Sequence, residues 1–291
     1  MTHLEHQFGL CGKSVAPGCS KVTRAIVNSL KINSVSEQTR NGRRVFIKRR
    51  HVHGDQLAHL ANVYFRIWKI PIRFQSKVED WRRWEMKCFT MLNGDRFRVS
   101  SPNARTIIED KMPGRNLWDH INEKTLTLPM LRAAAHELHR AHQFVSDEFG
   151  GGWSHGDATA TNVIYDAKTE RARLIDFEIV HQRSLSTADR QADDLLTFLL
   201  DMAGLVSERE WLPFATCFLE AYADRRVIAK LSDRFALSGG LAWIWWEVRT
   251  NFAPPAKVRQ RLHALHDSVF GGSPATDVAE GLNYILPRPV G

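Results

Sequence analysis

The sequence predicts an α+β protein of two lobes, with an antiparallel sheet in the N-terminal lobe and mainly helices in the C-terminal lobe. Segments with strand character dominate up to about residue 112, and amphipathic segments of helical length dominate after residue 117. The chain has 291 residues, 43% hydrophobic and 25% charged, which is ordinary globular composition and excludes a disordered or collagen-like protein. This length fits two domains of typical size or two lobes of one larger unit.

The lobes are expected to meet at Met112-Pro113-Gly114, where a helix- and strand-breaking sequence follows the last predicted strand of the first lobe. We expect a flexible lead-in over residues 1–21 and an N-terminal lobe over 22–112. A C-terminal lobe over 113–272 and a tail over 273–291 complete the predicted organisation.

In the first lobe, Asn41-Gly42 is the strongest short hairpin signal, because both residues tolerate the positive φ of a tight turn. The predicted helices end where Pro71 and Asn93-Gly94 interrupt helical periodicity. Expected strands cover residues 24–30, 33–40, 43–50, 97–100 and 105–109, and expected helices cover 55–69 and 77–92.

In the second lobe, one strand–loop–strand passage between Trp153 and Phe177 interrupts a series of helices. The helices are predicted from apolar residues that recur with a period of 3.6. They cover residues 128–144, 188–203, 208–223, 238–250 and 256–269.

The positive net charge favours an anionic partner but does not identify its chemical class. Forty Lys and Arg against 32 Asp and Glu leave a formal charge of +8, which suits nucleotides, nucleic acid, acidic lipids or phosphorylated sugars. Five cations lie within residues 43–50, so a nucleotide is the first partner expected. The four cysteines form no CxxC pair, and the first residues lack the basic and apolar regions of a secretory signal. These features predict a cytoplasmic protein.

The strand–loop–strand passage contains the candidate catalytic and metal-binding residues. It places His155-Gly156-Asp157 on a tight loop and Asn162 before one strand, and Asp176 at the end of the returning strand. Carboxylate and amide oxygens at the two ends of a hairpin can hold Mg²⁺, so Asn162 and Asp176 are the expected metal ligands. Asp157 is then placed to orient or deprotonate an attacking hydroxyl. The alternative is a solvated turn Asp and an unrelated Asp at a strand end.

The two motifs together, His155-Gly156-Asp157…Asn162 and Ile175-Asp176-Phe177-Glu178, resemble the catalytic-loop and metal motifs of the protein-kinase-like superfamily. The resemblance is closest to its small-molecule branch, which includes aminoglycoside phosphotransferases, choline/ethanolamine kinases and lipopolysaccharide or Kdo kinases. It covers about residues 24–200. It implies a two-lobed protein-kinase-like fold and a reaction that uses ATP and Mg²⁺.

The resemblance also implies a phosphate-binding lysine on a strand and a helical glutamate paired with it. Lys48, in Val45-Phe-Ile-Lys48, matches the strand lysine. On the predicted helix over residues 77–92, Glu85 falls within the apolar arc of Trp84 and Cys88. Because a carboxylate on a buried face is costly unless paired, Lys48 is its expected partner. The alternatives are a solvated Lys48 on an edge strand and a Glu85 at the rim of the helix.

The passage from Thr106 to Gly114 resembles the hinge that binds the adenine edge, so Glu109 and Met112 are expected to contact the nucleotide. Either Asp193 or Asp194 resembles the helical aspartate that braces the catalytic loop. The sequence also departs from protein kinases: no Gly-x-Gly-x-x-Gly precedes the lysine, which leaves the loop near residues 32–36 to cover the phosphates. Gly156 replaces Arg, and Glu178 replaces the Gly of Asp-Phe-Gly. These departures disfavour protein kinase activity.

The sequence therefore predicts an ATP- and Mg²⁺-dependent phosphotransferase that acts on a hydroxyl of a small molecule, sugar or glycolipid. One alternative is a lipopolysaccharide- or Kdo-type kinase in peripheral contact with the membrane, since residues 63–74 mix aromatics with cations, although core packing is the simpler interpretation of that run. A non-catalytic pseudokinase scaffold and an RNA-associated kinase are further alternatives. Nucleic acid is not the expected partner, and the acceptor and the oligomeric state stay open.

Overall fold

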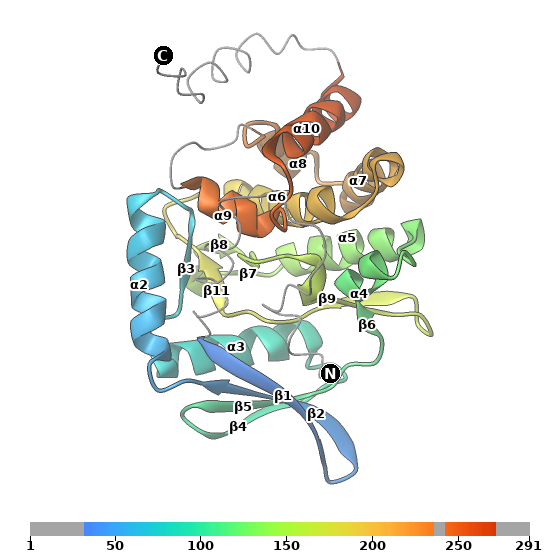
Figure 1. Cartoon of the computed structure of the whole chain (residues 1–291). Coiled ribbons are helices and arrows are strands. Elements are labelled where there is room, and N and C mark those ends of the chain that lie inside the picture. Colours follow the sequence, from blue (N-terminus) through green and yellow to red (C-terminus); the bar gives the residue numbers. More distant parts are fainter. Residues whose placement is uncertain (1–31, 236–241, 272–291) are drawn as a thin grey trace.

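The computed structural model describes residues 32–235 and 242–271 and has the predicted α+β architecture (Figure 1). An antiparallel sheet with the strand order β1-β2-β5-β4 lies at one end, and the helices of the C-terminal lobe lie at the other. The sheet strands are β1 (Asn33–Arg40), β2 (Arg43–Arg50), β4 (Val99–Asn103) and β5 (Thr106–Asp110). The lead-in, the strand predicted over residues 24–30 and the tail from 273 lie outside the described residues.

The hairpin predicted at Asn41-Gly42 is confirmed. Both residues have positive φ, 49° and 73°, and the register runs without a break from Arg40 opposite Arg43 to Asn33 opposite Arg50. Alternation along β2 buries Val45 and Ile47 on one face, and it buries Lys48 on the other. The hairpin therefore sets the register that carries Lys48 into the interior.

Helix α3 (Val78–Asn93) packs between the sheet and the C-terminal lobe. Its buried face combines apolar residues with one carboxylate, that of Glu85. Cys88, Phe89 and Leu92 join a core cluster that continues through Trp153 and Phe177 into the helices of the second lobe. The two lobes therefore share one hydrophobic core through α3.

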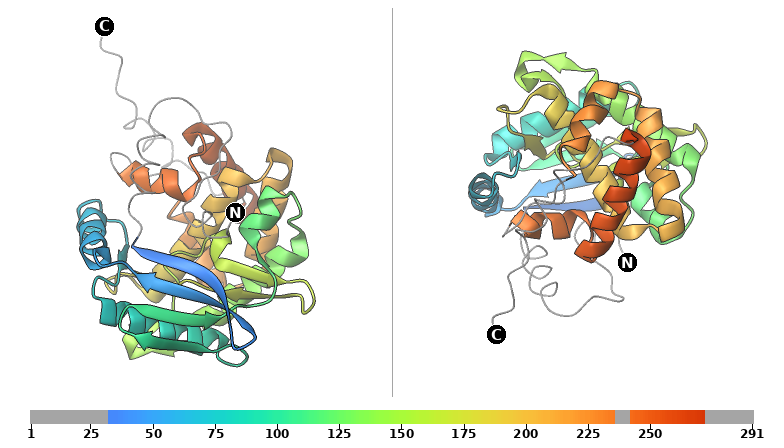
Figure 2. Two further views of the ribbon diagram at one scale, coloured as in Figure 1. Left: turned by 60° about the horizontal axis from the view of Figure 1, so that its bottom comes forward. Right: turned by 90° about the horizontal axis from the view of Figure 1, so that it is seen from above.

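Helix α2 (Gly54–Ile67) and strand β3 (Ile72–Phe74) lie between β2 and α3 in the sequence. Strand β3 pairs with β11 (Ile179–His181), a short ribbon that the sequence did not indicate. With the sheet turned toward the viewer, α2 lies beside one edge of the sheet and the C-terminal helices lie behind it (Figure 2). The Phe65 ring of α2 lies 5.1 Å from that of Trp245. All four aromatics of residues 63–74 pack in this small second core, as expected for core residues.

The C-terminal lobe is mainly helical, and its predicted helices over 128–144, 188–203, 208–223 and 256–269 are present with ends shifted by up to two residues. The predicted helix over 238–250 is described only from residue 242. The helices are α4 (Leu117–Asn122), α5 (Leu128–His142), α6 (Thr187–Leu205), α7 (Glu208–Tyr222), α8 (Arg225–Ser232), α9 (Ala242–Arg249) and α10 (Pro255–Phe270). Short strands are β6 (Arg115–Asn116), β7 (Val145–Ser146), β8 (Gly151–Gly152), β9 (Val163–Asp166) and β10 (Arg171–Leu174).

Polar residues begin three of these helices. Asn116, Ser186 and Asp224 each accept a hydrogen bond from a backbone N–H in the first turn of α4, α6 and α8. Helix α8 was not predicted, and Asp224 was the local signal that could have indicated its start. In the part of the chain that the structure describes, no helix combines the length and the apolar character needed to cross a bilayer.

Helix α6 approaches the end of α9 so closely at Gly204 that a Cβ there would lie 1.9 Å from the carbonyl oxygen of Thr250. A Gly→Ala change inside a helix normally stabilises a protein by about 1 kcal/mol. Here we expect Gly204→Ala to lower the free energy of unfolding by at least ~2 kcal/mol, because the backbones must separate. Urea unfolding followed by circular dichroism measures this.

Gly42→Ala is the control, because Gly42 has positive φ but no atom within 4 Å of the added Cβ. Its expected cost is about 1 kcal/mol from backbone conformation alone. A Gly204→Ala variant as stable as the wild type would contradict the packing argument.

Candidate active site

Lys48 of β2 lies at the centre of the candidate site, where only 5% of the residue is exposed. Its ammonium forms an ion pair with Glu85 of α3, the pairing that the resemblance implies and that the place of Glu85 on the apolar helix face favours. Burial disfavours the charge of Lys48, but the carboxylates of Glu109, Glu85 and Asp176 outweigh it and raise the pKa of Lys48 well above its usual value. Lys48 is therefore a permanent cation.

Glu85 is fully buried and uses both carboxylate oxygens. One oxygen pairs with Lys48, and the other accepts a hydrogen bond of 2.9 Å from the backbone N–H of Phe177. Burial raises the pKa of Glu85 well above its usual value, and the charge of Lys48 opposes that shift. Through this one side chain, α3 is attached both to the sheet and to the segment that follows Asp176.

Two further carboxylates surround the ammonium of Lys48. Asp176 Oδ1 lies 3.3 Å and Glu109 Oε1 3.4 Å from its Nζ. Glu109 is on β5, the neighbour of β2 in the sheet, and burial raises the pKa of its carboxyl while Lys48 opposes the rise. Its side chain thus lies beside the phosphate-binding candidate. Met112 instead packs in the large core, so its expected contact with a nucleotide would come from its backbone.

Asp194, and not Asp193, braces the candidate catalytic loop, which covers residues 155–162. The carboxylate of Asp194 accepts hydrogen bonds from the backbone N–H groups of His155, at 2.7 Å, and Gly156, at 2.8 Å. Asp193 points elsewhere and pairs with His181 and Arg249, at 3.1 and 3.0 Å. Helix α6 therefore fixes the loop through a carboxylate that accepts two backbone donors.

Local geometry explains His155 and Gly156. Gly156 has a φ of +86°, and a Cβ at this position would lie 2.8 Å from the carbonyl oxygen of Ile179, so the loop requires glycine. His155 accepts from the N–H of Asp157 at Nδ1, 3.3 Å away, and contacts the carbonyl of Ile175 at Nε2, 3.0 Å away. Burial lowers the pKa of His155, so the neutral ring with its proton on Nε2 satisfies both contacts.

Asn162 joins the proposed base to the proposed metal position. Its amide nitrogen donates to the backbone oxygen of Asp157 at 2.9 Å and to Asp157 Oδ2 at 3.2 Å. The backbone oxygen of Asn162 accepts a hydrogen bond from the N–H of Ile175 at 3.0 Å. Because Asp176 directly follows Ile175, this bond also fixes the position of Asp176 relative to Asn162. Burial raises the pKa of Asp157 to about 7, against the opposing charge of Arg249.

The donor set fits a divalent cation. Asn162 is 2% exposed, yet its Oδ1 has no hydrogen-bond partner among the described protein atoms. A buried amide oxygen without a donor is costly unless a ligand satisfies it. With the Asp176 carboxylate, it offers the hard oxygen ligands that Mg²⁺ prefers. The metal roles of Asn162 and Asp176 remain predictions that this geometry supports.

Glu178 has a partner that the sequence did not indicate. Its carboxylate accepts a hydrogen bond from Asn33 at the start of β1. Burial, followed by the charge of Asp176, raises the pKa of Glu178 to about 8. The phosphate-covering loop expected near residues 32–36 is not a loop from Asn33 on, because residues 33–36 pair with β2 as part of β1, in agreement with the strand predicted over 33–40. Asn33 is the member of this group that reaches the segment after Asp176.

Two more residues of the site escaped prediction. Asp201 accepts a hydrogen bond from the N–H of Ala160 at 2.7 Å and so holds the far end of the catalytic loop. Arg249 of α9 pairs with Asp193 and lies over the ring of Trp245, 5.0 Å from its centre. Asp201 follows Asp194 by seven residues, so a helical repeat was the available signal for it.

No protein-family model matches the chain, and no curated protein matches it in sequence. Among solved structures, it is similar to an ethanolamine kinase of Plasmodium vivax, with 11% identity and a TM-score of 0.43 over 87% of this chain and 78% of the other. It is similar to the ADP-bound aminoglycoside phosphotransferase APH(2'')-Ib, with 11% identity and a TM-score of 0.40 over 85% and 98% of the chains. A Mycobacterium tuberculosis protein in complex with erythromycin shares 16% identity and a TM-score of 0.33, over 66% of this chain and 51% of the other.

Proposed function

We propose that this protein is an ATP- and Mg²⁺-dependent phosphotransferase that phosphorylates a hydroxyl of a small molecule, sugar or glycolipid. One observation carries the proposal: a continuous set of contacts joins the groups that such a reaction needs. Lys48 pairs with Glu85 and Asp176, and Asp176 follows Ile175, which is hydrogen-bonded to Asn162. Asn162 in turn holds Asp157.

In the proposed reaction, Lys48 binds the α- and β-phosphates of ATP, and Glu85 fixes the position of its ammonium. Asn162 and Asp176 would hold Mg²⁺, which would supply positive charge against that of the phosphates. Asp157 accepts a hydrogen bond from the acceptor hydroxyl and takes its proton as the oxygen attacks the γ-phosphorus. The bond from that phosphorus to the bridging oxygen breaks, and ADP leaves. Positioning and charge neutralisation supply most of the rate.

The acceptor is best identified by a transfer screen. Labelled ATP with Mg²⁺ would be offered with amino alcohols, aminosugars, sugar acids and extracted glycolipids, and labelled products would be separated by chromatography. Transfer to one class identifies the acceptor chemistry, and a glycolipid product would favour the membrane-associated alternative. Absence of transfer to every class, together with absence of ATP hydrolysis and ATP binding, would contradict the proposed function.

Asp157→Asn should reduce phosphate transfer by about 10²–10⁴-fold, because it removes the proton acceptor and keeps the shape of the side chain. Asn162 can still donate to the amide oxygen of the substituted side chain, so we expect the melting temperature to change little. Turnover on the acceptor found in the screen and thermal unfolding are the two measurements.

The matched control is Asp166→Asn, which removes a carboxylate that caps the turn after β9 through Lys168 and Thr169. It should keep nearly wild-type turnover. An Asp157→Asn enzyme with unchanged turnover would show that Asp157 is not the base.

Glu85→Gln should weaken kcat/KM for ATP by about 10–100-fold, because the neutral amide holds the Lys48 ammonium less firmly. Glu79→Gln, on the exposed side of the first turn of α3, is the control. Steady-state kinetics with varied ATP measures the effect. Equal values for Glu85→Gln and Glu79→Gln would contradict the role given to the ion pair.

A further inference from the structure

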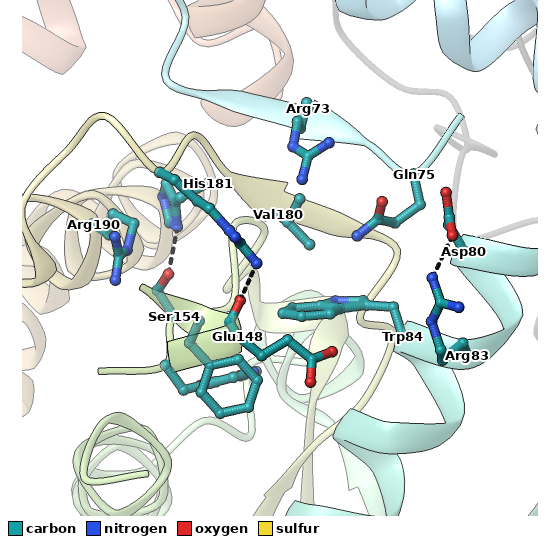
Figure 3. A pocket seen from close by; sticks show the side chains of 13 residues that line it. Arg73, Gln75, Asp80, Arg83, Trp84, Glu148, Ser154, Val180, His181 and Arg190 are labelled. Atoms are coloured by element: carbon teal, nitrogen blue, oxygen red, sulfur yellow. Dashed lines mark hydrogen bonds and ion pairs between the residues drawn. The ribbon is translucent and has the colours of Figure 1, made fainter. Parts of the chain in front are cut away.

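A cavity of about 530 Å³ lies beside the candidate active site and is lined by different residues (Figure 3). Its walls come from the first half of α3, from the β3–β11 ribbon and from residues 148–154. Lys48, Asp157, Asn162 and Asp176 do not line it. Its size falls within the range of small-molecule sites.

Strand alternation explains how polar groups reach this cavity. Along β3 and just beyond it, Ile72 and Phe74 pack into the second apolar core, so Arg73 and Gln75 project from the other side of the strand into the cavity. Val180 of β11 is the register partner of Arg73 and also lines the cavity. The ribbon that the sequence did not reveal therefore supplies one wall.

Four arginines line the cavity, and three of them have no carboxylate partner among the described residues. Arg83 is paired with Asp80, and Glu148 with Lys87, so these charges cancel. The three other arginines are Arg73, Arg183 and Arg190. Within the described ranges 32–235 and 242–271, no Asp or Glu oxygen lies within ion-pair distance of any of them. None of the three guanidinium groups is neutralised by a direct ion pair, although the charge of Asp194 acts on Arg190 from beyond that distance.

The existing partners of these guanidinium groups are neutral. Arg183 donates to the backbone carbonyl of Glu148, and Arg190 donates to the carbonyls of Leu185, Gly150 and Gly152. Arg190 is 2% exposed; burial lowers its pKa, the charge of Asp194 opposes that shift, and the charge of Arg183 adds to it. Arg73 and Arg183 are exposed and keep free donors. An anion in the cavity would relieve this concentration of like charge.

We propose that this cavity binds a small molecule that carries a phosphate group. Arg73 and Arg183 bind the phosphate, because the planar fork of a guanidinium matches two phosphate oxygens. The rest of the molecule packs against Trp84, whose indole borders the cavity floor and is held edge-to-face by Phe149 at 5.7 Å. This proposal does not depend on the function proposed for the active site.

Such a ligand would join segments that also build the candidate site. Trp84 precedes Glu85 on α3, Ser154 precedes His155, and Val180 follows Phe177 by three residues. A ligand held between Arg73 and Trp84 therefore restrains α3 relative to the β3–β11 ribbon. We expect slower amide hydrogen exchange in both elements when the cavity is occupied.

The test uses phenyl phosphate as the probe on the full chain. Millimolar probe should raise the melting temperature of the wild type by about 3 °C. The double variant Arg73→Gln/Arg183→Gln should lose this shift and bind at least tenfold more weakly by titration calorimetry. The control double variant Arg66→Gln/Arg209→Gln removes two exposed arginines on α2 and α7 and should behave as the wild type.

Arg73→Lys keeps the charge but loses the fork, so it should weaken binding severalfold and remain folded. Benzoate, a ring with one charge, should bind at least tenfold more weakly than phenyl phosphate. No shift in the wild type, equal shifts in the cavity and control variants, or equal affinity for benzoate would each overturn the proposal. Unchanged hydrogen exchange in α3 and β11 with bound probe would overturn its location.

Discussion

The buried ion pair of Lys48 and Glu85 is the constraint on which the rest of the structure depends. Breaking a buried pair by removal of one partner typically costs about 3–5 kcal/mol, because the remaining charge has lost its solvation. Direct contacts stabilise the pair in the interior. The ammonium of Lys48 on β2 pairs with one oxygen of Glu85 on α3, and the backbone N–H of Phe177 donates to the other oxygen. The sheet, α3 and the segment after Asp176 are therefore held at one point. Neither lobe could move far without exposing or separating these charges.

Two buried aspartates of α6 position the candidate catalytic loop from the other side. Asp194 and Asp201 lie seven residues apart on α6, so both point from the same face. The first accepts from two N–H groups at the start of the loop and the second from Ala160 near its end. Asp157 lies between these attachments. The loop geometry thus follows from α6 and from the glycine at 156, before any ligand binds.

Local signals in the sequence were sufficient for most of the fold. The Asn41-Gly42 turn, the helical periods and the position of Glu85 on the apolar face each depend on neighbours within a few residues, and the structure agrees with each. The β3–β11 ribbon joins segments about a hundred residues apart, and two three-residue strands carry too little pattern to reveal it. Asp193 and Asp194 differ by about 100° around a helix, so only the packed structure separates the brace from the partner of His181 and Arg249.

The five cations that lie close together in residues 43–50 do not form one positively charged site in the folded protein. Residues 43–50 contain five cations, but strand alternation and nearby acids divide them. Arg50 is buried and paired with Asp55, Arg44 is paired with Glu37, and Lys48 is the one that enters the candidate site. There it meets three carboxylates, and burial raises the pKa of two of them, those of Glu85 and Glu109, while the charge of Lys48 opposes both shifts. Guanidinium groups without a direct ion pair among the described residues lie instead in the arginine-lined cavity, on side chains from β3 and from residues 183–190, which are distant in sequence. A phosphate would therefore meet carboxylates beside Lys48, whose charge a divalent cation would offset, whereas no described carboxylate lies within ion-pair distance of Arg73 or Arg183.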